Sequence, residues 1–226
     1  MSVFPSVQNP NGKSSYAGRY HDGRAIYFYD KSNGNRVYNG RFWIKRESYS
    51  LPLGSSFETA KGCFHNDKKN GKWKFSNKTK GLHKILIADY SNGRYEGLYF
   101  YKSVCHSRAF NFMTGTTILR LQMSDGIPVG DVIGNFCGEE LSGHYDSNGC
   151  PDGLWKMDRT KAGLCYNDYE LWEHGVCKES YSIDESTGEK IKSRNQLPNL
   201  VMNILYKEGS HFEHLTKKSH HRKNYN

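Results

Sequence analysis

The chain lacks the long apolar runs of a membrane protein and the start of an exported one. No segment reaches the roughly 18 to 20 consecutive apolar residues that a membrane-spanning helix requires, and the mean hydropathy is −0.81. The opening residues, MSVFPS, provide neither the basic start nor the apolar stretch of a secretory signal. The sequence therefore excludes a transmembrane role, and we expect the protein in the cytoplasm.

Zinc-binding cysteine motifs are also missing. The six cysteines form no Cys-x-x-Cys pair and no Cys/His quartet of the zinc type; they are Cys63, Cys105, Cys137, Cys150, Cys165 and Cys177. An even number leaves three disulfides open, but a chain without an export signal normally keeps its cysteines as thiols. We therefore expect free thiols, with no bound metal and no cofactor.

Catalytic motifs are absent as well. The chain contains no Gly-x-x-x-x-Gly-Lys-Ser/Thr phosphate loop, no dinucleotide-binding glycine pattern, no His-Glu-x-x-His and no Gly-x-Ser-x-Gly. Glu139 and Glu140 are adjacent, so on a strand they would project to opposite faces and could not form an acid–base pair. A nucleophilic thiol beside a histidine stays open, although no local pattern favours it. The sequence thus favours a noncatalytic protein.

Aromatic residues and glycine are abundant instead. The 226 residues include 16 Tyr, 11 Phe, 4 Trp and 23 Gly but only 6 Pro, which is typical of many short strands joined by tight turns. Asn-Gly or Asp-Gly, the dipeptides of hairpin turns, begins at positions 11, 22, 33, 39, 70, 92, 125, 148 and 152. Side chains alternate between these turns, as in Lys72-Trp73-Lys74-Phe75. These features predict an all-β antiparallel meander of stacked β-hairpins.

A Gly-x-aromatic triplet recurs through the chain. Its first three copies begin at Gly18, Gly40 and Gly62, at two steps of 22 residues. Stacked hairpins can share one row of buried rings, and a glycine lets the neighbouring backbone approach a ring closely. We therefore assign structural roles to Gly18, Tyr20, Gly40, Phe42, Gly62, Phe64, Gly71, Trp73, Gly97, Gly153 and Trp155.

Two longer patterns overlap this triplet. Tyr-x-Gly-x-aromatic occurs at 16–20, 38–42 and 95–99, and Asn-x-x-x-x-Gly-x-aromatic at 66–73, 92–99 and 148–155. In these patterns residues 16–180 resemble the MORN repeat family, especially its looser bacterial variants in antitoxin-like proteins. The resemblance implies an open, curved, single-layer sheet that serves as a scaffold or binding surface. Residues 103–142 match the repeat poorly, so they either continue the stack or form an inserted loop.

The sequence divides into four parts. We expect an N-terminal extension (1–15), a MORN-like hairpin-repeat domain (16–192), a capping-helix region (193–215) and a basic disordered tail (216–226).

The capping region has the pattern of an amphipathic helix. Pro198 suits a first helical turn, Val201 and Leu205 fall on one apolar face together with Leu200 and Ile204, and Gly209 is a plausible stop. A short C-terminal helix laid over the last hairpin would cover the apolar end of the stack and its last sheet edge. The alternative is a helix that docks into a partner.

Charge is distributed unevenly along the chain. Residues 1–121 carry 20 Lys/Arg against 7 Asp/Glu, residues 122–190 carry 5 against 14, and residues 191–226 carry 7 against 2. The densest basic segment is 61–84, where Lys72 and Lys74 would share one strand face and Trp73 and Phe75 the other. The candidate binding residues are Lys68, Lys69, Lys72, Lys74, Tyr95 and Tyr99.

These observations favour a scaffold that engages a protein partner through its sheet surface. One alternative is an antitoxin or immunity protein that neutralises a toxic enzyme. Another is a peripheral protein that binds anionic lipid through the lysines of 61–84. Nucleic acid is an unlikely partner because the aromatic side chains would point inward. Exposed strand edges would also permit self-association, and a lysine face that serves only solubility stays open.

Overall fold

The computed structural model describes residues 14–20, 23–50, 54–106, 114–161, 164–193 and 196–217. The expected N-terminal extension and basic tail therefore lie almost wholly outside the described residues, and so do the expected turns at Asn11-Gly12 and at Asp22. No helix in the described part is long and apolar enough to cross a membrane.

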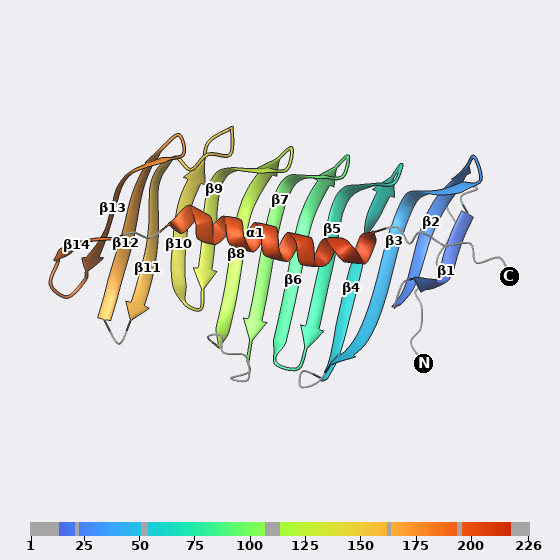
Figure 1. Cartoon of the computed structure of the whole chain (residues 1–226), viewed down its shortest axis with the longest axis horizontal. Coiled ribbons are helices and arrows are strands. Elements are labelled where there is room, and N and C mark those ends of the chain that lie inside the picture. Colours follow the sequence, from blue (N-terminus) through green and yellow to red (C-terminus); the bar gives the residue numbers. More distant parts are fainter. Residues whose placement is uncertain are drawn as a thin grey trace.

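The chain forms one open sheet of 14 strands in which each strand pairs antiparallel with the next (Figure 1). The strands are β1 (Ser14–Tyr20), β2 (Gly23–Ser32), β3 (Asn35–Ser50), β4 (Gly54–His65), β5 (Lys68–Thr79), β6 (Leu82–Ser91), β7 (Arg94–Cys105), β8 (Gly115–Ser124), β9 (Ile127–Phe136), β10 (Glu139–Tyr145), β11 (Gly153–Lys161), β12 (Leu164–Glu173), β13 (Val176–Asp184) and β14 (Lys190–Lys192). The predicted all-β meander is confirmed. Strands β7 to β10 pair in order, so the described residues of the segment 103–142 continue the stack.

Hairpin tips form where a left-handed residue precedes a glycine. Asn33, Asn92 and Asp125 have φ of 49°, 54° and 49°, and each is followed by a glycine at the tip between two strands. This backbone conformation matches the right-handed twist of the flanking strands. The sequence prediction is confirmed at these three turns.

The same prediction was wrong at Asn39-Gly40 and Asn70-Gly71. Gly40 lies inside β3 and Gly71 inside β5, at points where the pairing with the neighbouring strand shifts register. Their φ values of +114° and +67° are positive, a conformation that glycine adopts without steric cost. These are β-bulges, which bend a strand and increase its twist. The turn before β5 lies at Asn66-Asp67 instead.

A bulge glycine followed two residues later by a buried side chain is the structural repeat. Trp73, Tyr99 and Trp155 each stand two residues after a glycine of positive φ, and each is fully buried. In β9 the same places are taken by Gly130 and Val132. The sequence pattern missed this copy because valine replaces the aromatic residue.

The other predicted repeat positions supply the same row of rings. Phe42 and Phe64 are buried, with ring centroids 5.2 Å apart. Gly18 packs against the Tyr16 ring, while the side chain of Tyr20 lies outside the described residues. The rings thus form one continuous core along a single face of the sheet.

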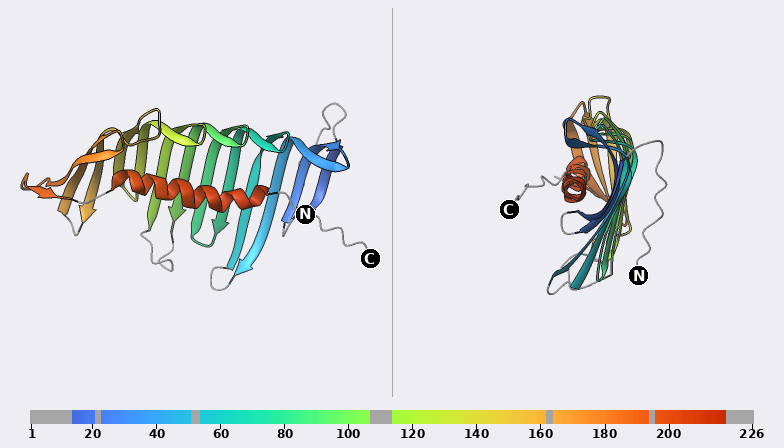
Figure 2. Two further views of the ribbon diagram at one scale, coloured as in Figure 1. Left: turned by 45° about the horizontal axis from the view of Figure 1, so that its top comes forward. Right: turned by 90° about the vertical axis from the view of Figure 1, so that its right-hand side faces the viewer.

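The C-terminal segment forms α1 (Leu197–Glu213), followed by the 3₁₀ turn η1 (His214–Thr216). The helix lies in the hollow of the curved sheet and runs back from β11 to β4 (Figures 1 and 2). The expected position over the end of the stack was therefore wrong. The reason is the row of rings, which offers far more apolar surface than the short, exposed β14.

Gly209 also departs from its expected role. The helix continues past it to Glu213, and a Cβ at Gly209 would lie 3.0 Å from the Tyr95 hydroxyl oxygen. Val201 and Leu205 are buried against the sheet as expected. Gly209 therefore allows close approach of helix and sheet rather than ending the helix.

Candidate functional site

The two faces of the sheet have different surroundings. The concave face carries the buried rings and is covered by α1, whereas no described helix lies on the convex face (Figure 2). Side chains alternate between the two faces as predicted: Trp73 and Phe75 are fully buried, while Lys72 and Lys74 are exposed.

Lys69 belongs to the concave side. It is buried, and its Nζ donates to Oε2 of Glu213 on α1 at 2.5 Å while lying 5.1 Å from the Tyr90 ring centroid. Burial lowers the pKa of Lys69, and the nearby Glu213 carboxylate partly offsets that effect. The expectation of a surface binding residue was wrong for Lys69, which instead fastens the helix.

The two tyrosines proposed for binding also lie under the helix. Tyr99 is fully buried, and its ring packs edge-on against the half-buried Tyr95 with centroids 5.4 Å apart. Burial raises the pKa of Tyr95 to about 12 and that of Tyr99 well above its ordinary value. Tyr99 is thus a core residue, and its assignment to a binding surface was wrong.

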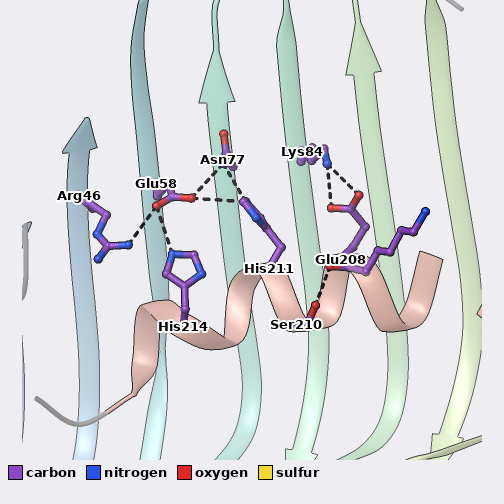
Figure 3. A network of polar contacts seen from close by, with 9 residues as sticks. Arg46, Glu58, Asn77, Lys84, Glu208, Ser210, His211 and His214 are labelled. Atoms are coloured by element: carbon purple, nitrogen blue, oxygen red, sulfur yellow. Dashed lines mark hydrogen bonds and ion pairs between the residues drawn. The ribbon is translucent and has the colours of Figure 1, made fainter. Parts of the chain in front are cut away.

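A polar cluster secures the C-terminal end of α1 (Figure 3). Glu58 on β4 lies 3.4 Å from Nε2 of His211 and 3.5 Å from Nε2 of His214, and Arg46 approaches it to 3.6 Å. Asn77 donates to Oε1 of Glu58 at 3.0 Å. Among the described residues, no group of three metal-ligating side chains is arranged to hold a metal ion, and no disulfide joins the six cysteines. The cluster therefore holds the helix.

The pKa of Glu58 reflects this cluster. Burial works to raise it, but the hydrogen bond to His211 and the charges of His214, His211 and Arg46 together outweigh burial, so the pKa lies below the ordinary 4.5. A further ion pair, Lys84 Nζ to Glu208 Oε1 at 2.8 Å, fastens the middle of the helix. Side chains of opposite charge thus match α1 to the concave face.

The convex face contains a depression of about 380 Å³ across β3 to β6, lined by Trp43, Thr59, Lys61, Lys74, Ser76, His83 and Ile85. Strand pairing fixes its geometry. Lys61 on β4 stands directly opposite Lys74 on β5. Two residues along the same strands, Thr59 stands directly opposite Ser76. Two lysines and two hydroxyl-bearing residues thus stand at the corners of a square in the strand register, which we call the polar square.

Positive charge gathers around this depression. We define the lysine face as Lys45, Lys61, Lys74, Lys78 and Lys102, which all project from the convex side of β3 to β7. In the part of the chain that the structure describes, none of these lysines forms an ion pair. Like charges placed directly opposite on paired strands repel one another. The lysine face therefore suits an anionic partner.

The pKa of His83 is affected by the positive potential of the lysine face. Its Nε2 lies 3.0 Å from Oγ of Ser76. Partial burial lowers the pKa of His83, and the charges of Lys78, Lys74 and Lys102 lower it further. An anion bound beside these lysines would oppose that effect.

Of the predicted binding lysines, only Lys74 lines the depression. Lys68 and Lys72 are exposed but lie closer to the hairpin tip, where Lys72 stands opposite Asp89. Trp43, Thr59 and His83 could not be predicted from the sequence, because their meeting depends on the register between strands. The period-2 alternation within each strand was the only available signal.

No protein-family model matches the sequence, and a comparison with curated proteins gives no match.

Proposed function

We propose that the protein is a noncatalytic β-repeat scaffold that binds the acidic surface of a protein partner through the lysine face. The observation that carries this proposal is the unpaired Lys61 and Lys74, which stand opposite each other on the one sheet face that α1 leaves uncovered. The MORN resemblance of the sequence accords with a scaffold role.

The opposed lysines of the lysine face carry an electrostatic cost that a bound anion would remove. Placing Lys61 opposite Lys74, with no acidic residue directly opposite either of them, costs stability. A partner that supplies carboxylates or other anions would relieve the repulsion. Such complementarity mainly accelerates association and excludes wrong partners. An antitoxin or immunity role is one form of this proposal, in which the acidic partner is a toxic enzyme.

Charge reversal tests the proposal. We expect the double variant Lys61→Glu/Lys74→Glu to lose a protein that the wild type retains in affinity capture. The control is Lys192→Glu/Lys207→Glu, which changes net charge equally at two exposed positions outside the lysine face. The purified complex should weaken with rising salt. Equal capture by both double variants would exclude the lysine face as the binding surface.

Vesicle flotation separates the protein partner from the membrane alternative. With a protein partner, vesicles that contain phosphatidylserine should retain the wild type and the Lys61→Glu/Lys74→Glu variant equally poorly. Salt-sensitive flotation of the wild type alone would favour the anionic-lipid function instead.

A further inference from the structure

We propose that the convex depression binds a phosphate monoester carried by a side chain of the protein partner, with phosphotyrosine as the best fit. This inference rests on the proposed function and names the group that the lysine face recognises.

The polar square supplies the contacts for a phosphate. Directly opposed residues on antiparallel strands have Cβ atoms about 4.5 to 5.5 Å apart, so the flexible Lys61 and Lys74 side chains can converge on one ligand. Thr59 and Ser76 add hydroxyl donors on the neighbouring row. When Nε2 of His83 carries the proton, it donates to Ser76 Oγ, and the serine hydroxyl hydrogen is available to the ligand.

The charge of the site favours a dianion. Two lysines without an acidic partner match a phosphate monoester, which carries about 1.5 to 2 negative charges at neutral pH. A carboxylate or a phosphodiester headgroup would leave one of the two charges unbalanced. This difference favours a phosphorylated side chain over the common diester lipids.

The size and apolar wall of the depression favour an aromatic carrier. A volume of about 380 Å³ exceeds the space that a phosphate group fills. Trp43 stands directly opposite Lys61, and Ile85 directly opposite Ser76, so apolar side chains flank the polar square on both sides. An aromatic ring next to Trp43 gains stacking or edge contacts that phosphoserine cannot make.

The test uses a short phosphotyrosine peptide, its unphosphorylated twin, a phosphoserine version and inorganic phosphate, each titrated calorimetrically into the full chain. We expect the phosphotyrosine peptide to bind at least about tenfold more tightly than its unphosphorylated twin, a preference that a single charge-assisted contact can supply. Phosphoserine and inorganic phosphate should bind more weakly than phosphotyrosine. Equal binding of the phosphorylated and unphosphorylated peptides would overturn the proposal.

Matched variants locate the site. Lys61→Gln and Lys74→Gln should each abolish the preference for the phosphorylated peptide. Lys72→Gln should retain it, because Lys72 lies on the same strand and face as Lys74 but outside the depression. If Lys72→Gln lost the preference as fully as Lys74→Gln, the depression would not be the site.

The wild type provides a readout that no folding defect can affect. Bound phosphate should raise the titration midpoint of His83, followed by NMR of its ring protons, because it offsets Lys61, Lys74, Lys78 and Lys102, the charged groups that surround His83 on this face. An unchanged midpoint with saturating peptide would contradict the assignment.

Two further outcomes separate this inference from the proposed function. If phosphopeptides fail to bind while Lys61→Glu/Lys74→Glu still abolishes partner capture, the phosphate inference fails and the protein-binding function stands. Vesicles containing phosphatidic acid, also a monoester, test the other source of this chemistry. Binding to them that needs Lys61 and Lys74, without any preference for phosphopeptide, would overturn the inference in favour of a membrane ligand.

Discussion

Gly62 lies so close to Trp73 on the adjacent strand that a Cβ atom at Gly62 would come within 2.2 Å of the indole ring. The same relationship recurs between Gly143 and Trp155, again at 2.2 Å. In both places the glycine leaves space for the indole of the next strand to lie across its backbone. The repeat is therefore defined by a contact between strands as well as by a pattern within one strand.

This contact predicts the effect of adding a single methyl group. Gly62→Ala and Gly143→Ala should each lower the free energy of unfolding by about 1 to 3 kcal/mol, because overpacking forces the indole to shift. Chemical denaturation measures the change. Cys63→Ala, at the exposed position next to Gly62, should have little effect. Alanine variants as stable as the wild type would show that the indoles can move aside without cost.

The two buried indoles differ in hydrogen bonding. Nε1 of Trp73 donates to the Cys63 carbonyl oxygen at 3.0 Å, whereas the buried Nε1 of Trp155 has no hydrogen-bond partner among the described residues. Trp73→Phe should therefore cost about 1 kcal/mol more than Trp155→Phe, the usual net contribution of one hydrogen bond. Denaturation of the two variants side by side measures this difference, and equal losses would contradict it.

Most of the sheet could be predicted from local chemistry. The turn at Asn92-Gly93 and the alternation around Trp73 depend on neighbouring residues only, so the sequence contains them. The bulge at Gly40 looks identical to a hairpin turn in sequence, since both need a glycine of positive φ. Only pairing with β2 distinguishes them, and pairing register is not a local property.

The position of the helix and the candidate site could not be predicted from local chemistry. Its amphipathic pattern showed that α1 has an apolar face but not which surface that face would cover. Once α1 covers the rings, Lys69 and Tyr99 become buried. Trp43 and His83 lie 40 residues apart in sequence and meet only through the pairing of β3, β4, β5 and β6.

The apolar contact between α1 and the sheet predicts an asymmetry between two aromatic residues of the helix. Phe212 is fully buried with its ring centroid 5.6 Å from that of Phe75, while Tyr206 is 70% exposed. Phe212→Ala should lower the free energy of unfolding by about 3 to 5 kcal/mol. Tyr206→Ala should change it by less than about 0.5 kcal/mol. Hydrogen exchange of the α1 amides would show whether unfolding of Phe212→Ala begins with release of the helix from the sheet.

The cluster around Glu58 predicts that fastening of the helix depends on pH. The folded-state pKa of Glu58 lies below the ordinary 4.5 because hydrogen bonding to His211 and three positive neighbours outweigh burial. A lowered pKa means that the folded state binds a proton less readily than the unfolded state. The stabilisation of the folded state by ionised Glu58 is therefore fully present above about pH 4.5, and it disappears as the pH falls through the folded-state pKa.

Glu58→Gln tests this dependence, since glutamine keeps the size of the side chain and one acceptor oxygen but loses the charge and the second acceptor. At neutral pH the variant should be less stable by about 1.5 to 3 kcal/mol, the range for hydrogen bonds to charged groups. The difference from the wild type should shrink below about pH 4.5, where the wild-type carboxylate also becomes neutral. Glu140→Gln, which removes an exposed carboxylate from β10, is the control and should leave stability unchanged. Only the charged form of Glu58 attracts Arg46, His211 and His214. If the stability difference between Glu58→Gln and the wild type stayed constant from pH 7 to pH 3, the charge of Glu58 would not be what holds α1 in place.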